Sequence, residues 1–173
     1  NHRQRIDADF AIAITADGVI SSQLVNQLDD AGNLKVQVGV EQGEAFRYPA
    51  WLQLQDDSRL YPLDRNFYQL SLAPLSSGAM IIGWIGFGYN IDQRLAAYFA
   101  NITELTTDFV ITNDAQTTLV ASSRGTLDAK SRQDESTMLG QILQKSQDEN
   151  IIATTFTLGE AEGQKLIAVM YGD

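Results

Sequence analysis

The sequence predicts an α+β fold built from two modules, each an antiparallel sheet with flanking helices, joined by a helix. Three observations lead to this prediction: a hairpin pattern near the start of the chain, a second copy of it about a hundred residues later, and an amphipathic helix between them. Hairpin connections this short make neighbouring strands antiparallel, with helices on one face of the sheet. We expect modules at 1–90 and 91–173, the second incomplete at its C-terminus.

The first hairpin is predicted from residues 10–22. Phe10, Ile12 and Ile14 alternate with alanines, and an Asp-Gly turn precedes a second strand. Residues 108–123, "DFVITNDAQTTLVASS", follow the same plan as "DFAIAITADGVISSQL", and their Phe residues are 99 positions apart. This indicates duplication of a module of about a hundred residues, which is too long a period for a solenoid. A chance match of two hairpins is the alternative.

Each hairpin is followed by a segment that permits a helix and then by two apolar strands. The helical segments are "SQLVNQLDD" and "ESTMLGQILQKSQDE", and the second places four apolar side chains on one helical face: Met138, Leu139, Ile142 and Leu143. The expected order in both copies is therefore strand, strand, helix, strand, strand.

One clear helix is predicted between the copies. Asn90 is a favourable N-cap residue, and Gln93 follows three positions later as in a capping box. Apolar residues then recur at helical spacing, namely Ile91, Leu95, Tyr98, Phe99 and Ile102.

The stretch "GWIGFG" raises the question of a phosphate-binding loop. Its glycines, Gly83, Gly86 and Gly88, have the reverse order of the dinucleotide fingerprint, and no lysine occurs between Lys35 and Lys130 to complete a P-loop. Alternation instead puts Gly86 and Gly88 on one face of a strand, where a neighbouring side chain can approach the backbone closely. We therefore predict that these glycines serve packing.

The strand "GWIGFGYNID", followed by the helix "QRLAAYFANITELT" and the strand "DFVIT", resembles the middle of an extracytoplasmic double Cache sensor domain. Such domains are tandem PAS-like modules that precede GGDEF or EAL output domains in bacterial membrane receptors. The resemblance implies a periplasmic ligand-sensing domain of an inner-membrane protein, with a cyclic-di-GMP output domain outside this sequence. It also implies that membrane anchoring, and homodimer formation through an N-terminal helix, depend on segments missing from this sequence.

Composition excludes several classes of partner and chemistry. The chain carries 12 Lys+Arg against 22 Asp+Glu, without a basic cluster, which argues against nucleic acid or anionic lipid as a partner. There is no cysteine, and the single histidine is His2, so we nominate no catalytic residue, no metal ligand and no cofactor. The domain itself is expected not to be an enzyme. The longest apolar run, residues 79–88, is too short to span a membrane.

Carboxylate chemistry supplies the alternative function. The pairs Asp29-Asp30, Asp56-Asp57 and Asp134-Glu135 lie beside predicted turns and are expected at the surface. Hydrolysis of sugars requires only two carboxylates in a cleft. A small secreted carbohydrate-binding module or carboxylate-dependent hydrolase is therefore the second hypothesis.

The candidate ligand site lies in residues 46–68, "FRYPAWLQLQDDSRLYPLDRNFY", which combine six aromatic rings with three arginines. Small-ligand pockets pair apolar walls with a few polar groups, and arginine clamps carboxylates. We predict a cavity for a small anionic molecule in the first module, lined by Arg47, Tyr48, Trp51, Tyr68 and Trp84.

This pocket prediction depends on strand register, because Tyr68 meets Trp84 only if the registers of their strands match. Rings that simply close a small core are the alternative. The resemblance places the ligand in the first, membrane-distal module. Its amino-acid-binding members carry an Arg-x-Trp-Tyr pattern, from which Arg47-Tyr48-Pro49-Ala50-Trp51 departs in spacing.

Overall fold

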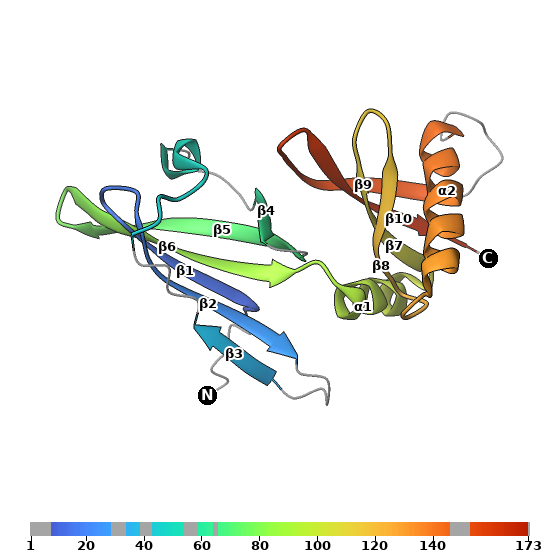
Figure 1. Cartoon of the computed structure of the whole chain (residues 1–173), viewed down its shortest axis with the longest axis horizontal. Coiled ribbons are helices and arrows are strands. Elements are labelled where there is room, and N and C mark those ends of the chain that lie inside the picture. Colours follow the sequence, from blue (N-terminus) through green and yellow to red (C-terminus); the bar gives the residue numbers. More distant parts are fainter. Residues whose placement is uncertain are drawn as a thin grey trace. The chain divides into compact units, whose positions relative to one another are not determined.

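The computed structural model describes residues 8–28, 34–38, 43–53, 59–63, 66–145 and 153–172 (Figure 1). The described strands form two antiparallel sheets, with the orders β3-β2-β1-β6-β5-β4 and β8-β7-β10-β9. This mostly antiparallel α+β architecture agrees with the predicted fold class. The chain divides into two compact units, the first comprising Asn1–Arg59 and Tyr68–Asn90, the second Leu60–Phe67 and Ile91–Asp173.

The first sheet consists of β1 (Phe10–Thr15), β2 (Ile20–Leu28), β3 (Leu34–Val38), β4 (Arg59–Leu63), β5 (Asn66–Ser77) and β6 (Met80–Asn90). The second consists of β7 (Thr106–Thr112), β8 (Thr117–Ser122), β9 (Ala153–Ala161) and β10 (Gln164–Tyr171). Three helices complete the described elements: the 3-10 helix η1 (Pro49–Gln53), α1 (Gln93–Thr103) and α2 (Ala129–Lys145).

The two predicted hairpins are β1-β2 and β7-β8, and they lie in separate sheets. Their places are equivalent, because the four-strand run β2-β1-β6-β5 of the first sheet matches β8-β7-β10-β9 of the second. The prediction for residues 10–22 and 109–123 is therefore confirmed.

Glycines of β6 receive the side chains of β1 and β5. Ile12 lies opposite Gly86 and Phe10 opposite Gly88 across the β1-β6 ladder. A Cβ at Gly86 would stand 2.7 Å from Leu72 Cδ2 and 2.8 Å from Ile12 Cγ2. The predicted packing role is confirmed for Gly86, because only bare backbone leaves room for these side chains. At Gly88 a Cβ would meet Phe10 and Tyr68 at 3.2–3.4 Å.

The helix expected directly after the first hairpin is wrong for the described residues. Residues 20–28 instead form β2, which pairs with β1 on one side and β3 on the other. Val25 lies opposite Phe10 and is 8% exposed, so the burial that favours the strand comes from a partner distant in sequence. Asp29 and Asp30, at the end of the expected helix, lie outside the described residues, as do Asp56, Asp57 and His2.

The helix predicted after Asn90 is present as α1, but its N-cap is Asp92 and not Asn90. The Asp92 carboxylate accepts a hydrogen bond from the Leu95 amide at 3.2 Å. The Asn90 amide instead donates to Asp9 Oδ2 at 2.8 Å, so Asn90 is still part of β6. The helix ends at Thr103, with Glu104 in the left-handed region (φ 59°).

The second unit packs its core on both sides of its sheet. Leu139 and Ile142 of α2 lie with Val110, Leu119 and Val169, while the other cluster includes Phe109, Leu166 and Ala96 of α1. Met138, predicted on one helical face with Leu139, Ile142 and Leu143, is 37% exposed. None of the helices in the described part of the chain has the length and hydropathy of a membrane span.

Candidate functional site

The aromatic segment of the first unit is tied to the turn between β1 and β2. The Phe46 amide donates to the Gly18 carbonyl, and the Ile20 amide donates to the Glu44 carbonyl, each at 2.8 Å. Val19 and Ala45 form an antiparallel bridge between these two bonds. Phe46 is 3% exposed, and it therefore anchors the segment that carries the candidate residues.

Tyr48 and Trp51 form a stacked pair of rings. Their centroids are 4.1 Å apart and their planes differ by 13°. The Trp51 amide donates to the Tyr48 carbonyl at 2.9 Å, and this turn at η1 brings the rings of positions 48 and 51 together. Phe46 meets both rings edge-on, at 6.2 and 6.1 Å between centroids.

Two arginines lie against this ring pair. The Arg47 Cζ is 5.4 Å from the Tyr48 ring centroid, and the Arg59 Cζ is 5.9 Å from the Trp51 centroid. A guanidinium within about 6 Å of an aromatic face is attracted by the ring quadrupole. The site prediction omitted Arg59, although its membership of the arginine-rich segment 46–68 was a visible signal.

The other two predicted residues stand apart from each other. Tyr68 lies opposite Asn90, whereas Trp84, six residues before Asn90 on β6, lies opposite Pro74. At 3.3 Å per residue this separation is about 20 Å along the strand. The registers thus do not bring Tyr68 and Trp84 together.

Tyr68 is a core residue, 1% exposed, with its ring 5.2 Å from that of Phe10. Trp84 is half-buried and pairs with Ile14, next to the turn that holds the aromatic segment. The structure therefore brings Arg47, Tyr48 and Trp51 together, puts Trp84 at the same end of the sheet, and leaves Tyr68 at the other end.

This arrangement is suited to a flat anion. Arg47 is exposed, while Tyr48 and Trp51 are half-buried, so the guanidinium and the rings are accessible from solvent. Arginine offers a planar fork of donors that matches a carboxylate, and the rings offer apolar contact beside it.

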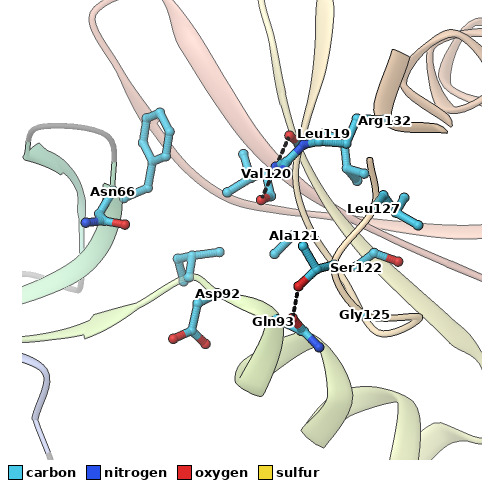
Figure 2. A pocket seen from close by; sticks show the side chains of 13 residues that line it. Asn66, Asp92, Gln93, Leu119, Val120, Ala121, Ser122, Gly125, Leu127 and Arg132 are labelled. Atoms are coloured by element: carbon cyan, nitrogen blue, oxygen red, sulfur yellow. Dashed lines mark hydrogen bonds between the residues drawn. The ribbon is translucent and has the colours of Figure 1, made fainter. Parts of the chain in front are cut away.

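A separate cavity of about 150 Å³ lies within the second unit (Figure 2). Its polar side chains largely bond to the protein: Thr126 donates to Gln93 Oε1 at 3.3 Å, and Arg132 Nη2 donates to the Leu119 and Val120 carbonyls at 3.2 and 3.0 Å. No sequence pattern indicates this cavity, because its lining comes from several separate segments. The lining residues include Asn66, Phe67, Ile91, Asp92, Ala121, Ser122, Gly125 and Leu127.

The second unit also holds a buried acidic cluster. The Tyr171 hydroxyl lies 2.7 Å from Asp108 Oδ2 and 2.9 Å from Glu135 Oε1. Arg124 forms ion pairs with both carboxylates. Glu135 is only 9% exposed, so the expectation of a solvated surface pair with Asp134 is wrong for Glu135.

Comparison with known proteins gives matches among solved structures. No protein-family model matches the chain, and no curated protein matches it in sequence. The extracellular domain of a protein described as a histidine kinase, vpHK1S-Z8, matches with a TM-score of 0.51 and 13% identity over 95% of this chain and 69% of that one. A domain of a sensory box/GGDEF family protein from Vibrio parahaemolyticus matches with a TM-score of 0.55 and 11% identity over 95% of this chain and 71% of that one.

At these identities the likeness shows a shared fold. One neighbour belongs to the GGDEF family named by the resemblance to double Cache sensors, and the other is the extracellular domain of a protein described as a histidine kinase. The chain thus shares the fold of these two domains.

Proposed function

We propose that the chain is the extracytoplasmic ligand-sensing domain of a bacterial transmembrane signalling protein. It consists of two PAS-like modules joined by α1, and it regulates a cyclic-di-GMP (GGDEF or EAL) output domain outside this sequence. The observation that carries the proposal is the fold shared with sensor-protein domains over 95% of the chain. The equivalent strand orders β2-β1-β6-β5 and β8-β7-β10-β9 support the duplication.

The proposed ligand is a small anion bound in the first module. Arg47 clamps its carboxylate, the stacked Tyr48 and Trp51 rings contact its apolar part, and Trp84 borders the site. Arg59, which lies 5.9 Å from the Trp51 ring, supplies a second positive charge. Two guanidinium groups on one ring pair give an otherwise acidic chain, net charge -10, a local preference for anions.

Signalling then follows from differential affinity. A ligand shifts an equilibrium between two conformations only as far as it binds one of them more tightly. In the receptor, the shift is transmitted through segments outside this sequence, including the N-terminal helix and membrane span, and through a homodimer formed by that helix.

The test is a thermal-shift screen with a panel of mono- and dicarboxylates. A binding anion at about a hundredfold its dissociation constant stabilises the folded state by ~2.7 kcal/mol. Arg47→Ala should abolish the shift, and Arg47→Lys should reduce it, because lysine keeps the charge but loses the planar fork. Lys130→Ala, an exposed cation of the second unit, should leave it unchanged. A panel without any shift would contradict the anion proposal.

The stacked rings also support a second candidate, a secreted carbohydrate-binding module. Half-buried Tyr48 and Trp51 offer an aromatic surface of the kind on which a sugar ring packs. Neutral oligosaccharides are therefore included in the screen. Stabilisation by a sugar that persists in Arg47→Ala, together with no membrane span in the full-length gene, would favour this candidate over the sensor.

A further inference from the structure

A single hydroxyl in the buried cluster of the second unit lies between two carboxylates. The Tyr171 hydroxyl has one hydrogen, yet it lies within hydrogen-bond distance of two carboxylates, at 2.7 Å from Asp108 and 2.9 Å from Glu135. If both carboxylates were ionised, the hydroxyl could donate to only one and would present a lone pair to the other. One extra proton satisfies both short contacts.

Surroundings decide which carboxyl holds that proton. Asp108 is 0% exposed, its Oδ1 has no hydrogen-bond partner, and its distance to Arg124 Nη2 is 3.6 Å. Glu135 makes the closer ion pair with the same arginine nitrogen. The arrangement that fits is a protonated Asp108 donating to the Tyr171 oxygen, and Tyr171 donating to an ionised Glu135.

The electrostatics of the three groups agree with this assignment. Burial raises the pKa of Asp108, and this effect outweighs the lowering by hydrogen bonds from Ser122 and Tyr171 and by the charge of Arg124. Burial would also raise the pKa of Glu135, but hydrogen bonds from Arg124 and Tyr171 outweigh it and hold that pKa below its usual value. Burial together with the neighbouring carboxylates raises the pKa of Tyr171, so the hydroxyl keeps its hydrogen.

The cluster joins four segments. Asp108 lies on β7, Glu135 on α2, Tyr171 at the end of β10, and Arg124 in the loop between β8 and α2. Among the described residues, these are the charged and titratable groups that face Asp108, and β8 contributes Ser122, which does not titrate. The Glu160–Lys165 ion pair lies at the opposite end of β10.

We propose that Asp108, Tyr171 and Glu135 form a proton-dependent latch that fastens α2 to β7 and β10 while Asp108 holds a proton and loosens α2 when that proton is lost. The acidity of the medium would then be an input separate from the ligand of the first unit. The inference does not depend on the anion site, because every group involved belongs to the second unit.

The sign of the pH dependence follows from the raised pKa of Asp108. Below the ordinary carboxyl pKa the group is protonated in folded and unfolded chains alike, so its contribution to stability is fully present. At higher pH the unfolded chain has already released this proton while the folded chain still holds it. As pH rises through the folded-state pKa, the folded chain releases it too, and the contribution of Asp108 to stability is lost. Glu135 has the opposite sign, and its contribution is lost as pH falls through its lowered pKa.

The test compares the chain with Asp108→Asn, because the introduced amide can donate to the Tyr171 oxygen at every pH. We expect the variant and wild type to melt alike near pH 3, and the variant to become relatively more stable as pH rises. The difference in Tm between variant and wild type should reach roughly 3–5 °C for each pH unit by which the pKa of Asp108 in the folded chain exceeds its value in the unfolded chain. Asp114→Asn, at an exposed position in the turn between β7 and β8, is the matched control and should show no such trend.

A second measurement uses wild-type protein alone, so it does not depend on the folding of any variant. The side-chain carboxyl ¹³C signal of Asp108 should titrate above the usual aspartate value of about 3.9. Hydrogen-exchange protection of the α2 amides, corrected for intrinsic rates, should fall over the same pH range and stay constant in Asp108→Asn. The latch proposal would be contradicted by a carboxyl signal that titrates at or below the usual value. It would also be contradicted if the protection of the α2 amides did not change over the pH range in which Asp108 titrates.

Discussion

Gly86→Ala tests whether the glycine-rich strand β6 is a packing surface. The added methyl group would lie 2.7 Å from Leu72 Cδ2, 2.8 Å from Ile12 Cγ2 and 3.0 Å from Leu70 Cδ1. Carbon atoms in good contact are separated by about 3.5–4.0 Å, so the two nearest contacts fall short by at least roughly 0.7 Å. Three side chains on two neighbouring strands would have to move at once.

The expected cost follows from two opposing effects. Overpacking of a filled core typically destabilises by ~1–3 kcal/mol, and three simultaneous contacts place this site in the upper part of that range. Alanine also lowers the conformational entropy of the unfolded chain, which stabilises the folded state by about 0.4–1 kcal/mol. The net loss should be about 1–2 kcal/mol. Gly88→Ala is the matched comparison, because its nearest contacts are 3.2–3.4 Å, and its two effects should nearly cancel.

Urea unfolding followed by tryptophan fluorescence measures this loss of stability in the first unit, which contains Gly86. The chain has two tryptophans, Trp51 and Trp84, and both belong to the first unit. The midpoint should shift to lower urea for Gly86→Ala and stay near wild type for Gly88→Ala, with similar slopes. A Gly86→Ala protein as stable as wild type, or a Gly88→Ala protein that loses as much, would refute the packing argument.

Two further substitutions test individual helix features. Asp92→Ala should destabilise the second unit by about 1 kcal/mol, because the α1 helix loses its N-cap. Asn90→Ala should leave that cap intact. Hydrogen exchange of the α1 amides distinguishes the two results. Gly140→Ala should raise the Tm of the second unit, because alanine is the better helix former by roughly 0.5–1 kcal/mol. The added Cβ would lie at an ordinary contact distance of 3.4 Å from Thr117. A lower Tm in calorimetry would contradict this prediction and would mean that α2 packs too tightly at Gly140 to accept a methyl group.

The features that the sequence predicted correctly depend on neighbours in the chain. Gly18, with φ +80°, and the Thr15–Gly18 hydrogen bond close the first hairpin. Asn113 closes the second by accepting hydrogen bonds from the amides of Ala115 and Gln116. The stacking of Tyr48 on Trp51 was not predicted, although it is equally local, since one turn of η1 separates the two residues. Turn chemistry and short spacing are readable from sequence because no distant partner is involved.

The features that were missed depend on distant partners. Asn90 and Asp92 are both good cap residues, and the choice between them involves Asp9, which is 81 positions from Asn90. Residues 20–28 form a strand because β1 and β3 flank them. The separation of Tyr68 from Trp84 is a property of the β5-β6 register, which local sequence does not specify.

The acidic cluster shows that part of a distant interaction can still be visible locally. Asp134 and Glu135 are adjacent and chemically alike, yet Asp134 is exposed and Glu135 is buried. The helical period distinguishes them, because Glu135 precedes the buried Leu139 and Ile142 by four and seven positions, the spacing of one helical face. A carboxylate at an apolar-face position requires a buried partner. The pattern of α2 therefore predicts that such a partner exists, although only the fold identifies Tyr171, Asp108 and Arg124 as the groups that supply it.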